Sequence, residues 1–363
     1  MNQTVENIKN ECIRLGSKPP TGLKRNQLIY YKQMLDYSIA NNIQLTTNIP
    51  KKKMIPTENW VGNSDIELYY QPIVRDKNID WVEHFYTHGW TTVKVPNFDI
   101  NGTTNEFIKW IESMDNNFNR YNTNTWNNTP KRFNGIFKHY IGHEEFMWQT
   151  REAVYPLFSQ LWNDNNLISS FDGACFMNNN NNKHKSWFHW DHSRWVGNNS
   201  TVQGFVNLLD NSSLDGGLVL LEGSHLVYDN YLARHPLEGH SPYFFVDITD
   251  PLLSICRPIK ICADAGELVL WNSKMTHCNV TPHNTNSARM CIYVSMQKRI
   301  AATQDELNKR IKAAENGRMT GHWCYGSDFN VNSVHPNWSN NDYKPQYIAR
   351  PKLNPLRMKL IGY

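Results

Sequence analysis

The sequence predicts a mainly β protein with flanking helices, built on a double-stranded β-helix, which is a cupin-like jelly roll. Between about residues 170 and 300, short apolar runs alternate with turn-forming residues, a pattern typical of antiparallel strands. The number of these runs suits the two packed sheets of a jelly roll. The candidate strands are residues 171–177, 187–190, 201–209, 218–221, 244–248, 259–261, 268–270 and 290–296.

Helices are expected on either side of this β region. In one of them Phe107, Ile111 and Met114 fall on a single side, at the spacing that an amphipathic helix requires. The tail that follows the last helix is rich in Asn, Pro and Trp and is expected to wrap the domain rather than fold alone. The expected helices are residues 105–118, 144–162 and 303–315, and a strand at 91–95 precedes them.

Length and charge set broad limits. A chain of 363 residues with a formal net charge of +4 suits one large domain with a small appendage. The mild positive charge permits an anionic partner without requiring nucleic acid. Seven cysteines without a Cys-x-x-Cys pair indicate neither a disulfide framework nor a zinc ribbon, so we expect a reducing intracellular compartment, cytoplasmic or nuclear. No signal peptide or membrane-spanning run is predicted. The frequent Asn residues are typical of AT-rich coding, as in giant viruses and some protists.

Four segments are expected along the chain. They are a helical hairpin at 1–40, a linker at 41–66, the β-helix domain at 67–300, and a C-terminal helix and tail at 301–363. The hairpin carries Ile8, Gly16, Thr21, Gly22, Leu28 and Ile29, with basic Lys24 and Arg25. This pattern resembles a SAP-type module, which implies nucleic acid as a partner through residues 1–53. A plain hairpin, docked on the main domain through Val5, Ile8, Leu28 and Leu35, explains the same pattern.

Three residues of the β region are candidate metal ligands, although His189 by itself would also suit a hydrogen-bonded surface or core histidine. His189 and Asp191 stand two apart in an expected strand, so their side chains project to the same face. His277 follows the strand-like run that ends at Trp271, toward the far end of the β region. Two histidines and one carboxylate leave coordination positions open, which is the arrangement of non-haem iron oxygenases.

Arg289 is the expected anchor for an acidic co-substrate. It follows His277 and begins the strand-like run 290–296. A guanidinium group binds a carboxylate through two parallel hydrogen bonds, which suits a dicarboxylate such as 2-oxoglutarate. The alternative is a surface salt bridge, which would contribute little.

Several motifs occur in a fixed order between about residues 85 and 296. They are residues 85–90 followed by Val93, then 187–191, 205–210, 216–218 and 223–225, and finally 266–271 leading to His277, Asn284, Ser287 and Arg289. In order and spacing this set resembles the phytanoyl-CoA dioxygenase family. The resemblance implies an Fe(II)- and 2-oxoglutarate-dependent dioxygenase, which uses O2, with a jelly-roll oxygenase core.

The resemblance also implies roles for individual residues. The iron ligands, which are the catalytic residues, would be His189, Asp191 and His277, and the co-substrate contacts would be Arg289, Asn207 and Asn279. The family often has a Lys on the strand before the metal motif, but residues 176–178 are Phe, Met and Asn here. Asp191 argues against a halogenase, because those relatives lose this carboxylate to make room for halide.

A hydroxylase of a small molecule is the leading interpretation. The alternatives are a nucleic-acid- or chromatin-directed oxygenase targeted by the SAP-like N-terminus, and a non-catalytic binding protein with a vestigial site. The intact triad counts against the last. Trp190, Arg194 and Trp195 are expected to line the substrate mouth, or else to pack in the core or rim. His225 is expected to be structural, and His192 to point away from the metal.

Overall fold

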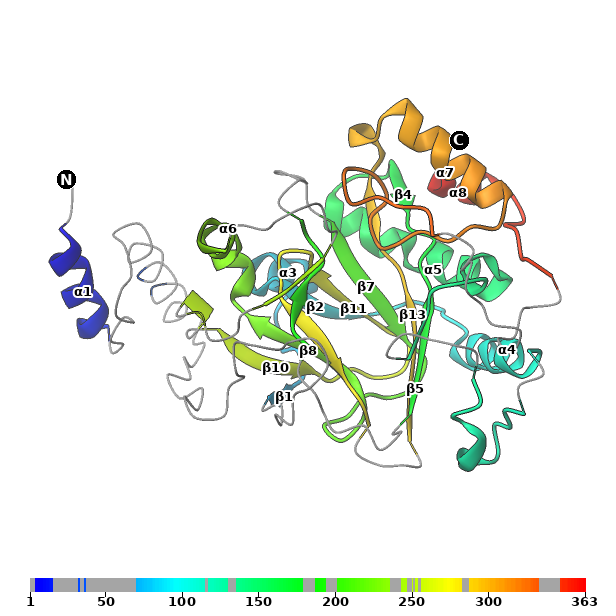
Figure 1. The fold of residues 1–363 in the computed structure, drawn as a ribbon, viewed down its shortest axis with the longest axis horizontal. Coiled ribbons are helices and arrows are strands. Elements are labelled where there is room, and N and C mark those ends of the chain that lie inside the picture. Colours follow the sequence, from blue (N-terminus) through cyan, green and yellow to red (C-terminus); the bar gives the residue numbers. More distant parts are fainter. Residues whose placement is uncertain are drawn as a thin grey trace.

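Two β-sheets and the helices around them form the body of the protein in this computed structural model (Figure 1). The predicted fold class, mainly β with a jelly-roll core, is confirmed. The structure describes residues 4–15, 32, 36, 70–114, 117–129, 135–178, 187–193, 201–235, 243–246, 250, 252–253, 256–282, 287–332 and 347–363.

The larger sheet pairs β2, β11, β7, β13, β5 and β3 in that order, and β14 extends it by pairing with β7 and β4. All these pairs are antiparallel. The strands are β2 (Trp90–Lys94), β11 (Glu267–Asn272), β7 (Val202–Asn207), β13 (Ala288–Tyr293), β5 (Ala174–Asn178), β3 (Ile136–Phe137), β14 (Met296–Lys298) and β4 (Leu167–Ser169).

The smaller sheet pairs β1, β10, β8, β12, β6 and β9 in that order. Its strands are β1 (Gln71–Ile73), β10 (Arg257–Ile261), β8 (Gly217–Glu222), β12 (His277–Val280), β6 (His189–Trp190) and β9 (Phe244–Phe245). His277 therefore begins a strand of its own, which was not among the strands expected from the sequence.

Side chains from both sheets meet in an apolar layer between them. Phe205 and Trp271 reach this layer from the larger sheet, and Leu218 and Leu220 reach it from the smaller one. Side chains alternate between the two faces of a strand, so every second residue of these strands points inward. The same inward positions carry the polar residues of the site described below.

Helices cover the outer face of the larger sheet. Their apolar sides share one buried cluster with β7, β11 and β14 (Figure 1). Arg310, fully buried, ties this layer together, because its guanidinium donates to the backbone carbonyls of Leu360 and Ile361 and to that of Ser169 in β4. The helices are α3 (Trp81–His88), α5 (Glu145–Trp162), α7 (Gln304–Glu315) and α8 (Pro355–Ile361), and α4 (Ile100–Glu112) packs beside α5.

The outer face of the smaller sheet is covered by α6 (Ser224–Arg234), where the sequence pattern indicated no helix. Its apolar residues are interrupted by polar ones, so the segment carries only a weak helical pattern. Tyr228 and Tyr231 of α6 pack against Trp190, at ring-centroid distances of 5.4 and 4.6 Å.

Near the N-terminus, α1 (Val5–Arg14) buries Ile8 and Cys12. Lys32 pairs with Glu11 at 3.5 Å and with Asp36 at 2.8 Å. The rest of the expected hairpin and all of the linker at 41–66 lie outside the described residues, so the SAP-like interpretation stays a prediction. None of the helices in the described parts of the chain is long and apolar enough to cross a bilayer.

Candidate metal centre and cavity

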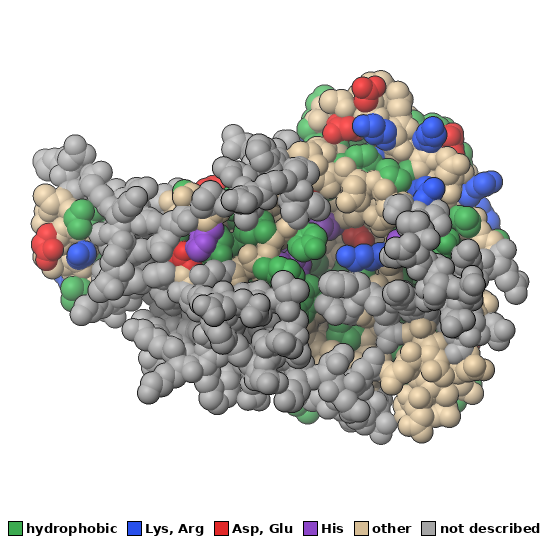
Figure 2. Space-filling model, viewed as in Figure 1, with side chains coloured by type: hydrophobic (Ala, Val, Ile, Leu, Met, Phe, Trp, Pro, Cys, Tyr) green, Lys and Arg blue, Asp and Glu red, His purple; other side chains and the backbone are tan. Residues whose placement is uncertain are grey.

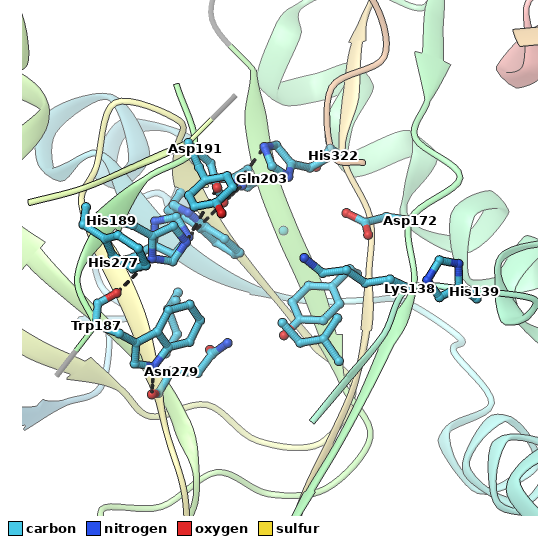
Figure 3. A pocket seen from close by; sticks show the side chains of 18 residues that line it. Lys138, His139, Asp172, Trp187, His189, Asp191, Gln203, His277, Asn279 and His322 are labelled. Carbon is cyan, nitrogen blue, oxygen red and sulfur yellow. Dashed lines mark hydrogen bonds and ion pairs between the residues drawn. The ribbon is translucent and has the colours of Figure 1, made fainter. Parts of the chain in front are cut away.

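His189, Asp191 and His277 come together at one end of the space between the sheets (Figure 3). His189 and His277 are direct partners in the antiparallel pairing of β6 with β12. Asp191 lies two residues beyond His189 and turns to the same side. Nε2 of His189 is 3.6 Å from Oδ1 of Asp191, and Nε2 of His277 is 3.3 Å from Oδ2. One donor atom from each of the three side chains lies within 4.8 Å of the other two. Among the described residues, no other group of three or more potential metal ligands is this close together.

Hydrogen bonds orient both imidazoles. Nδ1 of His189 lies 3.1 Å from the carbonyl of Trp187, and Nδ1 of His277 lies 3.1 Å from the carbonyl of Met275. Since a carbonyl only accepts, each Nδ1 carries the proton and each Nε2 keeps a lone pair for a metal. Burial lowers the pKa of His277, which favours the neutral ring that a metal ligand needs. The indole of Trp187 stacks on His189 at 4.8 Å with 8° between the planes.

The Asp191 carboxylate is held by residues that the sequence pattern did not single out. Gln203 of β7 donates from Nε2 to Oδ2 at 2.9 Å, and His322 places Nε2 3.9 Å from the same oxygen. Trp323 donates from Nε1 to the Asp191 carbonyl at 2.9 Å. Burial acts to raise the pKa of Asp191, but His322, His189 and His277 outweigh it and hold that pKa well below the usual range. Asp191 is therefore ionised, as a metal ligand must be.

Gln203 could have been found from the sequence, because it occupies an inward position of an expected strand. Phe205 and Asn207 mark that face of β7 at alternate positions. His322 had no such signal, because it lies in the irregular segment after α7, far along the chain from the metal motif.

Arg289 on β13 is a buried cation that lacks a counter-charge among the described residues. Its side chain is 2 % exposed, and its guanidinium lies 4.7 Å from the ring of Phe205. Nη1 donates to Oδ1 of Asn279 at 2.7 Å, whereas Nε and Nη2 have no hydrogen-bond partner. Buried, unsatisfied charged donors cost folding free energy, so this arrangement favours an anionic ligand.

The two asparagines proposed as co-substrate contacts differ in position. Asn279 lines the cavity and contacts Arg289, as described above. Asn207 is 1 % exposed, donates from Nδ2 to the Ala263 carbonyl at 3.0 Å, and does not line the cavity. Its role at the co-substrate stays a prediction.

The expectation that Trp190 lines the substrate mouth is wrong. Strand alternation sends its side chain to the opposite face from His189, where it is fully buried and donates from Nε1 to the Lys274 carbonyl at 2.9 Å. Arg194 and Trp195 lie outside the described residues. His192 turns away from the metal ligands, with Nδ1 2.8 Å from Oγ of Ser273.

A cavity of about 520 Å³ opens from the metal ligands across the space between the sheets. Figure 2 shows histidine, basic and acidic side chains gathered in a hollow on this face of the molecule. His189, His277 and Asp191 lie on one side, and Lys138, His139 and Asp172 lie on the other (Figure 3). The remaining wall is largely aromatic and polar, from Trp187, Gln203, Tyr243, Phe245, Trp271, Asn279, Tyr293, Ser295 and His322.

Comparisons with known proteins show which sequences and which fold the chain is similar to. The chain is 26% identical over 265 residues to Ava biosynthesis cluster protein O of Aspergillus versicolor, covering 68% of this chain and 85% of the relative. It is 25% identical over 263 residues to a Dictyostelium discoideum protein named for phytanoyl-CoA dioxygenase, covering 59% and 74%. The crystal structure of GlcNAc Inducible Gene 2 (DUF1479) from Candida albicans shares the fold, with a TM-score of 0.51 and 13% identity over 87% of this chain and 81% of that one. No protein-family model matches the chain.

Two histidines and one carboxylate that converge between the sheets of a jelly roll are the donor set of a non-haem iron oxygenase. The chain is also similar in sequence to a relative named for phytanoyl-CoA dioxygenase, in agreement with the motifs described above.

Proposed function

We propose that this protein is an Fe(II)- and 2-oxoglutarate-dependent hydroxylase of a small molecule, with His189, Asp191 and His277 as the iron ligands. The observation that carries the proposal is the convergence of their three donor atoms, each in the form that binds a metal. The donor set fits iron(II), because two imidazoles and one carboxylate leave coordination positions open for a co-substrate and O2.

Arg289 is the residue proposed to bind the far carboxylate of 2-oxoglutarate. Its unpaired Nε and Nη2 offer two donors to one carboxylate, and its bond to Asn279 orients the guanidinium. Tyr293 lies on the same strand as Arg289 and lines the cavity, and its buried hydroxyl has no hydrogen-bond partner. A dicarboxylate would satisfy groups that the folded chain leaves unsatisfied.

When bound, iron supplies the oxidising chemistry: one oxygen atom of O2 enters succinate, formed with CO2 from 2-oxoglutarate, and the other enters a C–H bond of the substrate. The chain itself provides geometry. Gln203 fixes one oxygen of Asp191, Trp187 fixes the plane of His189, and Trp271 packs edge-on at 5.4 Å from His277.

The nucleic-acid-directed alternative has less support. Within the segment 1–53 that was expected to bind nucleic acid, Lys32 is paired with Glu11 and Asp36, which offset its charge. The cavity, by contrast, has the size and aromatic lining typical of small-molecule sites. A vestigial site is disfavoured because the ligands, their orienting bonds and Arg289 are all in place.

The test is metal binding and co-substrate turnover in matched variants. Purified protein should bind Fe(II) under nitrogen and convert 2-oxoglutarate to succinate in air, even without the true substrate, at a slow uncoupled rate. His189→Ala should lose both properties. His235→Ala is the control, because His235 pairs with Asp250 away from the cavity. Unchanged iron affinity in His189→Ala would contradict the proposed ligand set.

A further inference from the structure

Asp172 is an acidic side chain on the cavity wall that the proposed chemistry leaves unused. It lies between β4 and β5, on the side of the cavity across from the metal ligands (Figure 3). The other carboxylate that lines this cavity, Asp191, is assigned to the metal. Asp172 is therefore the acidic group that remains for a substrate.

The backbone around Asp172 is held in place. Arg151 of α5, fully buried, donates from Nη2 to the Asp172 carbonyl at 3.1 Å and from Nη1 to the Gly142 carbonyl at 2.7 Å. Next to it, Gly173 packs so closely that a Cβ there would collide with the carbonyl oxygen of Phe137. A fixed backbone presents the carboxylate to the cavity at a defined position, as a recognition group requires.

Within the described residues, no cationic side chain is in direct contact with the carboxylate of Asp172. It accepts one hydrogen bond, at Oδ1 from the amide of Gly173 at 2.7 Å, and no ion pair joins it to a cation in the described parts of the chain. Burial raises the pKa of Asp172, while His322, the hydrogen bond from Gly173, Lys138 and Arg151 act in the opposite direction without overcoming it. A ligand cation within hydrogen-bond distance would stabilise the ionised carboxylate.

We propose that Asp172 binds a protonated amino group of the substrate, so that the substrate is a small amine-bearing molecule. This inference rests on the proposed function, because it takes the cavity to be the substrate site. A fatty acyl chain fits less well, since it would desolvate Asp172 and give it no partner. The exposed rings of Tyr243 and Phe245, also on the cavity wall, suit the hydrocarbon part of such an amine.

Lys138 lines the same wall, so an anionic substrate group is the competing occupant. Three matched probes separate these cases: phenethylamine, 2-phenylethanol and 3-phenylpropanoate carry similar hydrocarbon parts with positive, neutral and negative ends. Their affinities are measured by calorimetry on the full chain loaded with Fe(II) and 2-oxoglutarate under nitrogen, where no turnover occurs.

We expect phenethylamine to bind about tenfold or more tightly than 2-phenylethanol, the effect of one charge-assisted hydrogen bond. Asp172→Asn should remove most of this preference and leave the alcohol nearly unchanged. Asp172→Glu, which keeps the charge, should retain part of the preference if the Asn variant proves unstable. Asp305→Asn, an exposed acidic residue in the first turn of α7, is the control.

Equal affinity for amine and alcohol, or no measurable binding of the amine, would overturn the inference. If 3-phenylpropanoate bound most tightly, the inference would also be overturned, because Lys138 would then be the residue on this wall that binds the charged group of the substrate. Iron and 2-oxoglutarate affinities are titrated separately in the same preparations. If both bind while the amine is not preferred, only the inference fails. If the amine binds through Asp172 while iron does not bind, the proposed function fails and the amine site remains.

Discussion

Arg289 donates a hydrogen bond to Asn279 across the jelly roll, from β13 of the larger sheet to β12 of the smaller one, at 2.7 Å. The strand that begins with His277 also carries Asn279, two positions along and on the same face. This bond therefore links the proposed co-substrate anchor to the strand of a proposed metal ligand. Several consequences can be measured.

Arg289→Ala should raise the 2-oxoglutarate concentration needed for half-maximal succinate release by roughly 10- to 100-fold, because charge-assisted hydrogen bonds are lost. Arg289→Lys should fall between wild type and Ala, since an ammonium group cannot form the paired contact. Succinate formation is followed as a function of 2-oxoglutarate concentration. An unchanged half-saturation in Arg289→Ala would move the anchoring role to another residue.

Gln203→Ala should weaken metal binding about 10- to 100-fold, the usual effect of removing a group that orients a metal ligand. Without the bond from Nε2 to Oδ2, the Asp191 carboxylate can rotate away from the two imidazoles. Calorimetric titration with Fe(II) under nitrogen measures the change, and Gln304→Ala on the exposed first turn of α7 serves as control. Wild-type affinity would show that Asp191 needs no such support.

Trp190→Ala should act on stability and not on substrate choice. The side chain is fully buried against Tyr228, Tyr231 and Phe244, so truncation should cost about 3–5 kcal/mol of unfolding free energy. Denaturant unfolding measures this loss. Tyr121→Ala, with a side chain 89% exposed, should change stability by less than about 0.5 kcal/mol. A wild-type unfolding curve for Trp190→Ala would contradict the assignment of this residue to the core.

His225 should make the protein sensitive to acid. Burial lowers the pKa of His225 to about 4, below about 6.5 in an unfolded chain. The unfolded state therefore binds the proton first, so stability from this residue is present above pH ~6.5 and is lost as the pH falls toward 4. Between these pH values, His225 should contribute about 1.4 kcal/mol per pH unit to the pH dependence of the unfolding free energy. The unfolding free energy of wild type and of His225→Gln is measured between pH 7 and 4. It should fall less steeply with decreasing pH in the variant, and an equal fall in both proteins would refute this prediction.

The N-terminal segment offers a separate test of the nucleic-acid alternative. Duplex DNA binding is compared, at two salt concentrations, for the full chain and a chain starting near Asp65. With Lys32 neutralised by Glu11 and Asp36, we expect equal and weak binding by both. Binding that falls steeply with salt and disappears on truncation would instead favour a phosphate-binding hairpin.

The order of strands along the chain, and therefore the jelly roll, could be predicted from the sequence because alternation of apolar residues is a local property. The sequence also predicts that His189 and Asp191 project to the same side, because residues two apart on a strand share a face. The C-terminal partner His277 was predictable from the motif around it, but its strand was not. The helix α6 was missed because its burial comes from contacts with Trp190 and the smaller sheet.

What the sequence determined by itself was the fold class and the identity of the candidate metal ligands, both of which depend on near-neighbour patterns. Tertiary structure alone decided which distant groups surround them. Strand alternation places Gln203 on the inward face of β7, but its contact with Asp191 comes from the tertiary structure. The same is true of His322, which reaches Asp191 from the segment after α7, and of Asp172, which reaches the cavity from between β4 and β5. Their positions follow from how the two sheets close on each other, because contacts between segments far apart in the chain leave no periodic signal in the sequence.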